Sequence, residues 1–431
     1  MAQIHFNMVI TTGPNSHAQS IWAHPDDRHG VDLLSPGYWA DLGQLLERGM
    51  FDGIFFADTM ATSDSYAWET IEAGGAPRAD PWTLLPLIAQ ATTHLGLAAT
   101  LSTLGTPPFL AVRRIGAVDN LSGGRVAWNV VTSYLDSDFA ALGQKQPAHD
   151  ERYDQAEEFM EICYRLWDAF PRDALILDKR SGNYVDRDKL RLVDFAGNHH
   201  SCRAYPAMVQ SEQGRPLIFQ AGASPRGMRF AATHADACFA LQPRTAMKSY
   251  VERLGEAANE VGRPQPRPFF GVQPFIGGTQ EEAQRRIAEL EERVPMGTAL
   301  NRLGGLLGRD FAEDELDRPI GISQTQASQG WMEAIAHVSE GNELTLRQMA
   351  LHFAISPMTP RIVGTPEQVA DTLEAWWHDT GCYGFTIVPE VLTSSIEAFG
   401  SEVVPILRKR GLMRSEYAGT TYRENLSQQR G

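Results

Sequence analysis

The segment 217–227, with the sequence LIFQAGASPRG, is the part of this chain whose residues most clearly suggest a binding site. Ser224 suits the N-cap of a helix, because its hydroxyl can accept a hydrogen bond from an unpaired backbone N–H. Pro225 suits the first helical position, where a missing N–H costs nothing. A helix N-terminus after a turn of small residues, here Gly222 and Ala223, favours an anion such as phosphate. The same pattern also fits a well-capped turn without a ligand.

Polar residues lie at the end of two other apolar runs and inside a third. Asp58 follows Ile54 to Ala57, and its carboxylate either caps the next turn or binds a ligand. Thr103 follows a third run, and Asn129 interrupts a fourth. A buried amide must find hydrogen-bond partners, so Asn129 is either a satisfied structural residue or part of a site.

His149 and Tyr153 open a long helical pattern and are spaced by four residues. This spacing places both side chains on one helix face, from which they could contact a phosphate. Simple packing at a helix start would produce the same pattern.

The elements that position these residues are eight apolar or β-branched runs that alternate with helical patterns. Such alternation indicates parallel βα units, and the number eight favours a closed (β/α)8 TIM barrel. An open doubly wound sheet is less favoured, because no dinucleotide-binding fingerprint follows any run. The predicted strands are Ile4–Ile10, Gly53–Ala57, Leu95–Ser102, Arg125–Val131, Leu217–Gln220, Ala237–Leu241, Phe269–Phe275 and Tyr383–Val388.

Four long segments exceed what a minimal barrel needs, so we expect a single domain over 1–431 with insertions. The insertions are about 11–35, 59–80, 171–215 and 294–363. The first, second and fourth follow the first, second and seventh strands, which places them at the C-terminal face where barrel active sites form. The third is polar and rich in turn signals. The tail 412–431 is polar and either wraps the molecule or frays.

Composition narrows the class of protein. The chain of 431 residues is 43% hydrophobic and has a formal net charge of −15, which argues against nucleic-acid binding. No apolar stretch is long enough to predict a membrane span, and no signal peptide is recognisable. The four cysteines and the His24, Asp26, Asp27, His29 cluster match no metal motif, so we predict no metal site. Together these features predict a cytoplasmic protein.

Six motifs occur in order along the chain: FDGIFFAD at 51–58, WNVVTS at 128–133, HDERY at 149–153, QAGAS at 220–224, RGLMRSEY at 410–417 and TYRE at 421–424. Together they resemble one family, the bacterial-luciferase-like flavin monooxygenases. More narrowly, they resemble its nitrilotriacetate, dibenzothiophene-sulfone and long-chain-alkane monooxygenase branch. The resemblance runs from about residue 3 to residue 426.

The resemblance implies a (β/α)8 barrel that uses reduced FMN (FMNH2), delivered by a separate NAD(P)H-dependent flavin reductase. Dioxygen then reacts with the flavin, and the flavin–oxygen adduct oxidises a small organic substrate. The family suggests a homodimer or homotetramer.

The resemblance also implies roles for individual residues. Asp58 matches a position near the isoalloxazine ring. Thr103 and Asn129 match positions on the oxygen-binding side of the flavin, where they would donate hydrogen bonds to developing negative charge. Tyr134 stands where some relatives have histidine, which disfavours alkane hydroxylation. Contacts to the ribityl and phosphate groups of FMN are expected from Ser133, His149, Tyr153 and Gly222-Ala223-Ser224.

Two alternatives remain open at this point, a deazaflavin-dependent dehydrogenase of the same superfamily and a non-catalytic flavin-binding protein. Either would share the fold but not the oxygen chemistry. The substrate is undetermined. We expect a pocket lined partly by Phe55, Phe56, Tyr66, Trp68 and Tyr134, with His17 and Arg78 orienting a polar substrate.

Overall fold

The computed structural model describes residues 3–15, 17–61, 67–307, 311, 315–319, 344–356 and 359–427. Eight parallel strands form one sheet that closes on itself, because β10 pairs with β9 on one side and with β11 on the other. The predicted (β/α)8 barrel is therefore confirmed. The strands are β1 His5–Ile10, β2 Gly53–Phe56, β3 Gly96–Ser102, β4 Val126–Val131, β9 Leu217–Gln220, β10 Ala237–Ala240, β11 Arg267–Ile276 and β13 Gly384–Ile387.

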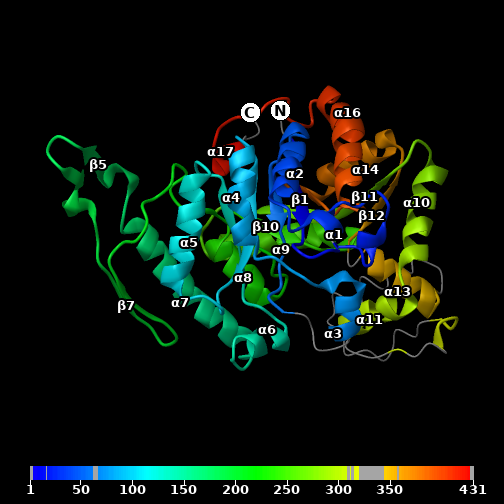
Figure 1. Cartoon of the computed structure of the whole chain (residues 1–431), viewed down its shortest axis with the longest axis horizontal. Helices are drawn as coiled ribbons and strands as arrows, with labels where there is room; N and C mark the ends of the chain where they lie inside the picture. Colours follow the sequence, from blue (N-terminus) through cyan, green and yellow to red (C-terminus); the bar gives the residue numbers. More distant parts are fainter. Residues whose placement is uncertain are drawn as a thin grey trace.

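Helices connect successive strands and surround the barrel (Figure 1). Two segments, TPEQ at 365–368 and TQEE at 279–282, have the sequence pattern of a capping box at a helix start. Thr365 forms the complete box with Gln368. Thr279 accepts from the Glu282 N–H, but the Glu282 carboxylate accepts from Gly278 instead, so this box is only half formed. The main helices are α2 Pro36–Arg48, α4 Pro81–Ala91, α5 Pro108–Leu121, α6 Asp136–Ala141, α7 His149–Asp168, α8 Pro225–His234, α9 Arg244–Glu260, α10 Gln280–Arg293, α14 Pro366–Thr380, α15 Leu392–Ala398 and α16 Val404–Lys409.

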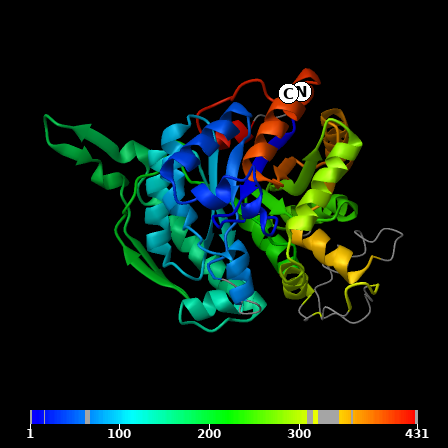
Figure 2. The same cartoon turned by 45° about the vertical axis from the view of Figure 1, so that its right-hand side comes forward.

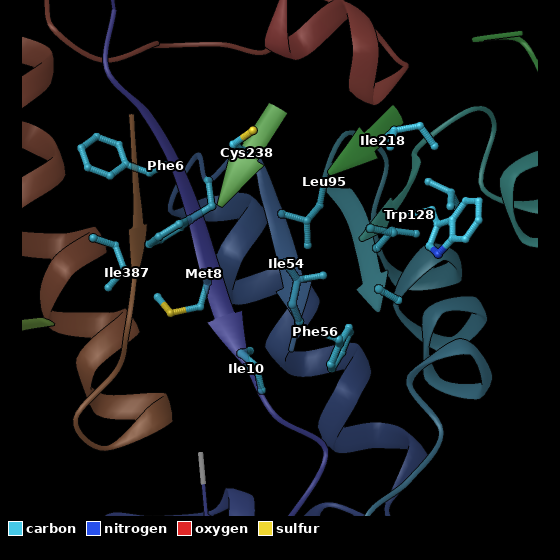
Figure 3. Close-up of a cluster of buried hydrophobic side chains, with 14 of the residues drawn as sticks. Phe6, Met8, Ile10, Ile54, Phe56, Leu95, Trp128, Ile218, Cys238 and Ile387 are labelled. Atoms are coloured by element: carbon cyan, nitrogen blue, oxygen red, sulfur yellow. The ribbon is translucent and has the colours of Figure 1, made fainter. Parts of the chain in front are cut away.

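Alternate residues of each strand face opposite sides of the barrel wall. Phe6, Met8 and Ile10 point outward into the apolar layer between strands and helices (Figure 3). A separate buried cluster fills the barrel, and Phe55 packs there against Phe219 and Phe239 at ring-centroid distances of 5.5 and 5.0 Å. The interior is thus a packed core, above which only the C-terminal ends of the strands can form a site.

The C-terminal tail closes the opposite end of the barrel. Helix α17, Tyr422–Leu426, buries Tyr422 and Leu426 in the interior cluster, and Tyr422 donates a 2.7 Å hydrogen bond to Asn7. Gly53, the first residue of β2, makes room for this helix, since a Cβ there would lie 2.6 Å from the Tyr422 hydroxyl. The described part of the tail therefore wraps the molecule and does not fray.

The insertion 171–215 contains regular structure that the sequence analysis missed. β5 Leu175–Asp178 pairs with β6 Asn183–Val185, and β7 Val193–Ala196 pairs with β8 Ser201–Ala204, both antiparallel. The two hairpins form an arm that projects from the barrel (Figure 1). These short strands were not predicted because the segment is polar and rich in residues typical of turns.

The helices of the insertion 294–363 lie at the edge of the barrel (Figure 2), where they contribute to a third buried apolar cluster. Helix α11, Met296–Leu307, and helix α13, Leu346–Ile355, pack together there. The insertion ends in a strand that was not predicted, β12 Arg361–Gly364, which pairs in parallel with the last four residues of β11.

The two remaining insertions contain only short helical turns among their described residues. Segment 11–35 forms η1 Ile21–Ala23 and α1 His29–Asp32. Segment 59–80 forms α3 Ala67–Thr70 and a π-helical turn, Ile71–Gly75.

Candidate active site

A polar layer lies directly above the aromatic floor of the barrel. Asn129 of β4 is buried, and its amide nitrogen donates to the Thr100 hydroxyl at 2.8 Å. The Thr100 hydroxyl in turn donates to the Phe56 carbonyl at 2.8 Å. The carbonyl oxygen of the Asn129 side chain is buried without a partner. A buried acceptor without a partner costs free energy unless a ligand donates to it.

The ends of β3 and β4 meet beside this layer. Ser133 follows β4 with φ 51°, an unusual backbone conformation for a non-glycine residue and one that clusters at functional sites. Its hydroxyl lies 3.0 Å from that of Ser102, and its carbonyl accepts from Arg152. Thr103 is buried at the end of β3, where its backbone N–H donates to the Val131 carbonyl at 3.0 Å. These contacts fix the positions of Ser133 and Thr103 at the C-terminal rim of the barrel, where the strands end.

The segment after β9 forms the capped turn that the sequence indicates. The Ser224 hydroxyl accepts from the Gly227 N–H at 3.1 Å and begins α8. Small residues are required in this turn, because a Cβ on Gly227 would lie 2.7 Å from the Tyr153 hydroxyl and one on Gly222 would lie 3.0 Å from it. The positive end of α8 and the nearby hydroxyls form a cradle suited to a phosphate.

Helix α7 brings His149 and Tyr153 to this cradle. The Nε2 atom of His149 lies 3.4 Å from the Ser224 hydroxyl, while its Nδ1 atom lies 2.7 Å from Asp150. The hydroxyl of Tyr153 lies within hydrogen-bonding reach of Ser224, and burial raises the pKa of Tyr153, so its hydroxyl is neutral and can donate to a ligand. The predicted neighbours Ser224, His149 and Tyr153 therefore come together, and Arg152 links them to the end of β4.

Asp58 ends β2 at the same rim. Burial raises the pKa of its carboxyl to about 7, although the nearby positive charge of Arg78 lowers it. Arg78 is held by hydrogen bonds to the Thr59 hydroxyl and the Gly75 carbonyl. A carboxyl that titrates near neutrality at a strand end is typical of a functional position.

Two of the five aromatic residues expected to line the pocket are buried in the core instead. Phe55 and Phe56 are core residues, inside the barrel and against Trp39 respectively. Trp68 and Tyr134 have 75% and 69% of their surface exposed, and Tyr66 lies outside the described residues. Alternation along a buried strand places both phenylalanines in packed layers, which the apolar character of the run alone does not reveal.

Two residues from the insertions reach the same region. His17 has a buried Nδ1 atom without a partner, and burial together with the charge of Arg302 lowers its pKa to about 4. Arg302 of α11 interacts electrostatically with Tyr134 and Arg78. Sequence analysis named His17 and Arg78 but missed Arg302, because its place near the rim depends on the fold of the insertion.

A closed (β/α)8 barrel with polar residues gathered at the C-terminal ends of its strands is the architecture of a large class of enzymes. A family profile described as luciferase-like monooxygenase matches residues 6–384. The chain belongs to this family. It is an enzyme of the flavin-dependent monooxygenase class, as the motifs predict.

Relatives cover nearly the whole chain. The dibenzothiophene-sulfone monooxygenase of Rhodococcus erythropolis (strain XP) is 36% identical over 98% of this chain and 96% of its own length. The N-acetyl-S-(2-succino)cysteine monooxygenase of Bacillus subtilis (strain 168) is 35% identical over 97% of this chain and 95% of its own length.

Solved structures give the same result. DmoA from Hyphomicrobium sulfonivorans has a TM-score of 0.92 at 31% identity, over 98% of this chain and 92% of its own. Riboflavin lyase, solved with modified FMN and riboflavin, has a TM-score of 0.85 at 30% identity, over 98% of this chain and 95% of its own.

Metal-binding and membrane-spanning features are both absent from the described part of the chain. Within it, no three histidine, cysteine or acidic side chains gather in a way that could hold a metal ion. None of its helices combines the length and apolar character needed to cross a bilayer.

Proposed function

We propose that the protein is the oxygenase of a two-component system that binds FMNH2 from a separate NAD(P)H-dependent flavin reductase and oxidises a small organic substrate with O2. The observation that carries this proposal is the cradle of Ser224, His149 and Tyr153 at the N-terminus of α8, where two glycines are sterically required. The solved relative that holds modified FMN supports flavin as the ligand.

The residues of the site suit this cofactor. The α8 N-terminus, with Gly222, Ala223 and Ser224, would hold the FMN phosphate, and Ser133 would contact the ribityl chain. Reduced FMN, when bound, supplies the electrons that activate dioxygen.

We expect three residues to face the flavin ring. Asn129 presents an unpartnered carbonyl oxygen to the interior, so it can accept from a ring N–H as well as donate through its second amide hydrogen. Thr103 would donate at the same rim. The exposed Tyr134 would contribute to the substrate side.

Substitution of Ser224 tests the phosphate site. Ser224→Ala removes a hydroxyl at the anion cradle, and we expect FMN affinity to fall by about 1–2 kcal/mol, or roughly 5- to 30-fold. Titration calorimetry measures the dissociation constant directly. Thr279→Ala is the matched control, because it removes the cap of α10 away from the cradle. An unchanged FMN dissociation constant in Ser224→Ala would show that the phosphate binds elsewhere.

Substitution of Asn129 tests the position of the flavin ring. We expect Asn129→Ala to keep FMN affinity within about threefold while product formed per FMNH2 oxidised falls severalfold, since the phosphate cradle is intact. Rapid mixing of the anaerobic FMNH2 complex with O2, with product quantified, measures this ratio. A wild-type ratio in the variant contradicts the assignment.

Two alternatives, a deazaflavin-dependent dehydrogenase and a non-catalytic flavin-binding protein that acts as a flavin carrier, can be distinguished from the oxygenase. Ligand-dependent melting and the rate of FMNH2 oxidation are the measurements. A ligand that binds the native state raises its melting temperature. We expect FMN to do so and a deazaflavin not to. Stabilisation by the deazaflavin alone would favour the dehydrogenase, and oxidation of bound FMNH2 at the free-flavin rate with every substrate tried would favour the carrier.

A further inference from the structure

Among the residues that the structure describes, Arg302 of α11, beside the proposed site, has no anionic partner. The Nε atom of Arg302 is buried and has no hydrogen-bond partner. No carboxylate in the described ranges forms an ion pair with Arg302, whereas other arginines there do, as Arg286 does with Glu390 and Arg361 with Glu291. A buried guanidinium N–H without an acceptor is costly, so the surroundings of Arg302 favour the binding of a hydrogen-bond acceptor such as an oxyanion.

The surroundings of Arg302 add to its positive potential. Arg78 is close enough for its charge to oppose that of Arg302, and it too forms no ion pair among the described residues. His17 faces the same group with a buried, unpartnered Nδ1 atom, and it is neutral near pH 7. The Tyr134 side chain also lies close enough to Arg302 to interact with it electrostatically.

The acidic groups nearby do not cancel this charge. Asp58 interacts with Arg78, but its carboxyl is only partly ionised near pH 7. Asp80 lies 3.8 Å from Arg114, and Asp138 accepts from the Ala61 N–H. The cradle for phosphate is served by other residues, at the start of α8. The surroundings of Arg302 are therefore separate from the cradle and contain no carboxylate that forms an ion pair with Arg302 or Arg78 among the described residues.

From this geometry we infer that Arg302, with Arg78 and His17, binds a carboxylate or a comparable oxyanion of the substrate. The inference rests on the proposed oxygenase function and specifies its substrate class. Arginine suits this role because its planar guanidinium can donate two parallel hydrogen bonds to one carboxylate. Arg302 is thereby a specificity residue that favours anionic over uncharged substrates.

The relatives supply probes for the test. N-acetyl-S-(2-succino)cysteine carries several carboxylates, whereas dibenzothiophene sulfone is uncharged. Binding of these two compounds, and of succinate and methanesulfonate, is measured on the complex with oxidised FMN, which does not turn over. The proteins compared are wild type, Arg302→Met, Arg302→Lys and Arg285→Met. Arg285 is the control, because it is a cation of similar size on the exposed face of α10.

We expect at least one anionic probe to bind wild type, with a 10- to 100-fold loss, about 1.4–2.7 kcal/mol, in Arg302→Met. Arg302→Lys should recover part of this loss, Arg285→Met should behave as wild type, and the sulfone should bind no worse to Arg302→Met. Failure of all three anions to bind, or equal weakening of anions and sulfone, overturns the inference.

Two further readouts distinguish substrate recognition from flavin binding and from a structural role. FMN affinity is measured first on each protein, because absence of FMN binding in wild type contradicts the proposed function itself, whereas weaker FMN binding only in Arg302→Met would assign Arg302 to the flavin. Melting without ligand is the second readout. Removal of an unpartnered cation should not lower the melting temperature, and a marked decrease would identify Arg302 as a structural residue.

Discussion

Asp58 shows how one buried carboxyl at the rim links stability to pH. Its folded-state pKa of about 7 lies above the ordinary value, because burial disfavours the charged form. The folded state therefore holds a proton that the unfolded state loses between about pH 4 and pH 7, so the free energy of unfolding falls as pH rises through this window. Above the folded-state pKa, this contribution is constant.

We expect Asp58→Asn to lose less stability than wild type between pH 5 and pH 8, by about 1 kcal/mol or more. Urea unfolding at both pH values measures the difference. Glu390 and Asp119, whose pKa values burial raises to about 7 and about 6, also titrate in this window, so the comparison with wild type is essential. Asp41→Asn is the exposed control. Identical pH dependence in wild type and Asp58→Asn would show that Asp58 is ionised throughout.

Residue-level prediction succeeded where local chemistry decides the outcome. Ser224 could be recognised as a cap because a hydroxyl followed by proline has few other uses at the end of an apolar run, and the structure shows that cap. Arg302 gave no such signal. Its unpaired charge results from the packing of α11 near the rim, and a sequence cannot show which arginines lack a carboxylate.

At the scale of elements, α17 closes the end of the barrel opposite the candidate site. Tyr422→Ala should lower the free energy of unfolding by about 3–5 kcal/mol, because it leaves a cavity in the interior cluster. Tyr422→Phe should cost about 1–3 kcal/mol, because it keeps the ring but leaves Asn7 Oδ1 without its donor. Urea unfolding measures both. Tyr205→Ala, at a residue with 77% of its surface exposed, is the control. A small effect of Tyr422→Ala would mean that the barrel closes without α17.

The elements that the sequence predicted are those that carry a strong repeating pattern. Buried parallel strands are continuous apolar runs, so all eight barrel strands were found within two residues at each end. The four short strands of the arm and β12 were missed, because three or four residues of mixed polarity carry no usable period.

At the scale of the whole molecule, contacts within one chain account least well for the stability of the arm of β5–β8. A two-stranded hairpin is marginally stable alone in water, yet β5 and β6 project from the barrel. Ile176, Leu177 and Tyr184 on this hairpin have 44%, 55% and 65% of their surface exposed. Apolar side chains gathered on a projecting element indicate a surface that a partner covers, and the homodimer or homotetramer expected from the sequence offers a second copy of the chain.

We therefore expect light scattering after size-exclusion chromatography to show a dimer or tetramer, and Leu177→Ser with Tyr184→Ser to shift it toward smaller species. The arm lies away from the cradle of Ser224, so FMN affinity per chain should stay at wild type in the variant. Val31→Ser with Leu34→Ser, at residues with 75% and 72% of their surface exposed outside the arm, is the matched control. The prediction is wrong if wild type is a monomer, or if the arm substitutions leave the oligomeric state unchanged. The hairpins would then have to be stabilised within one chain by their own backbone pairing.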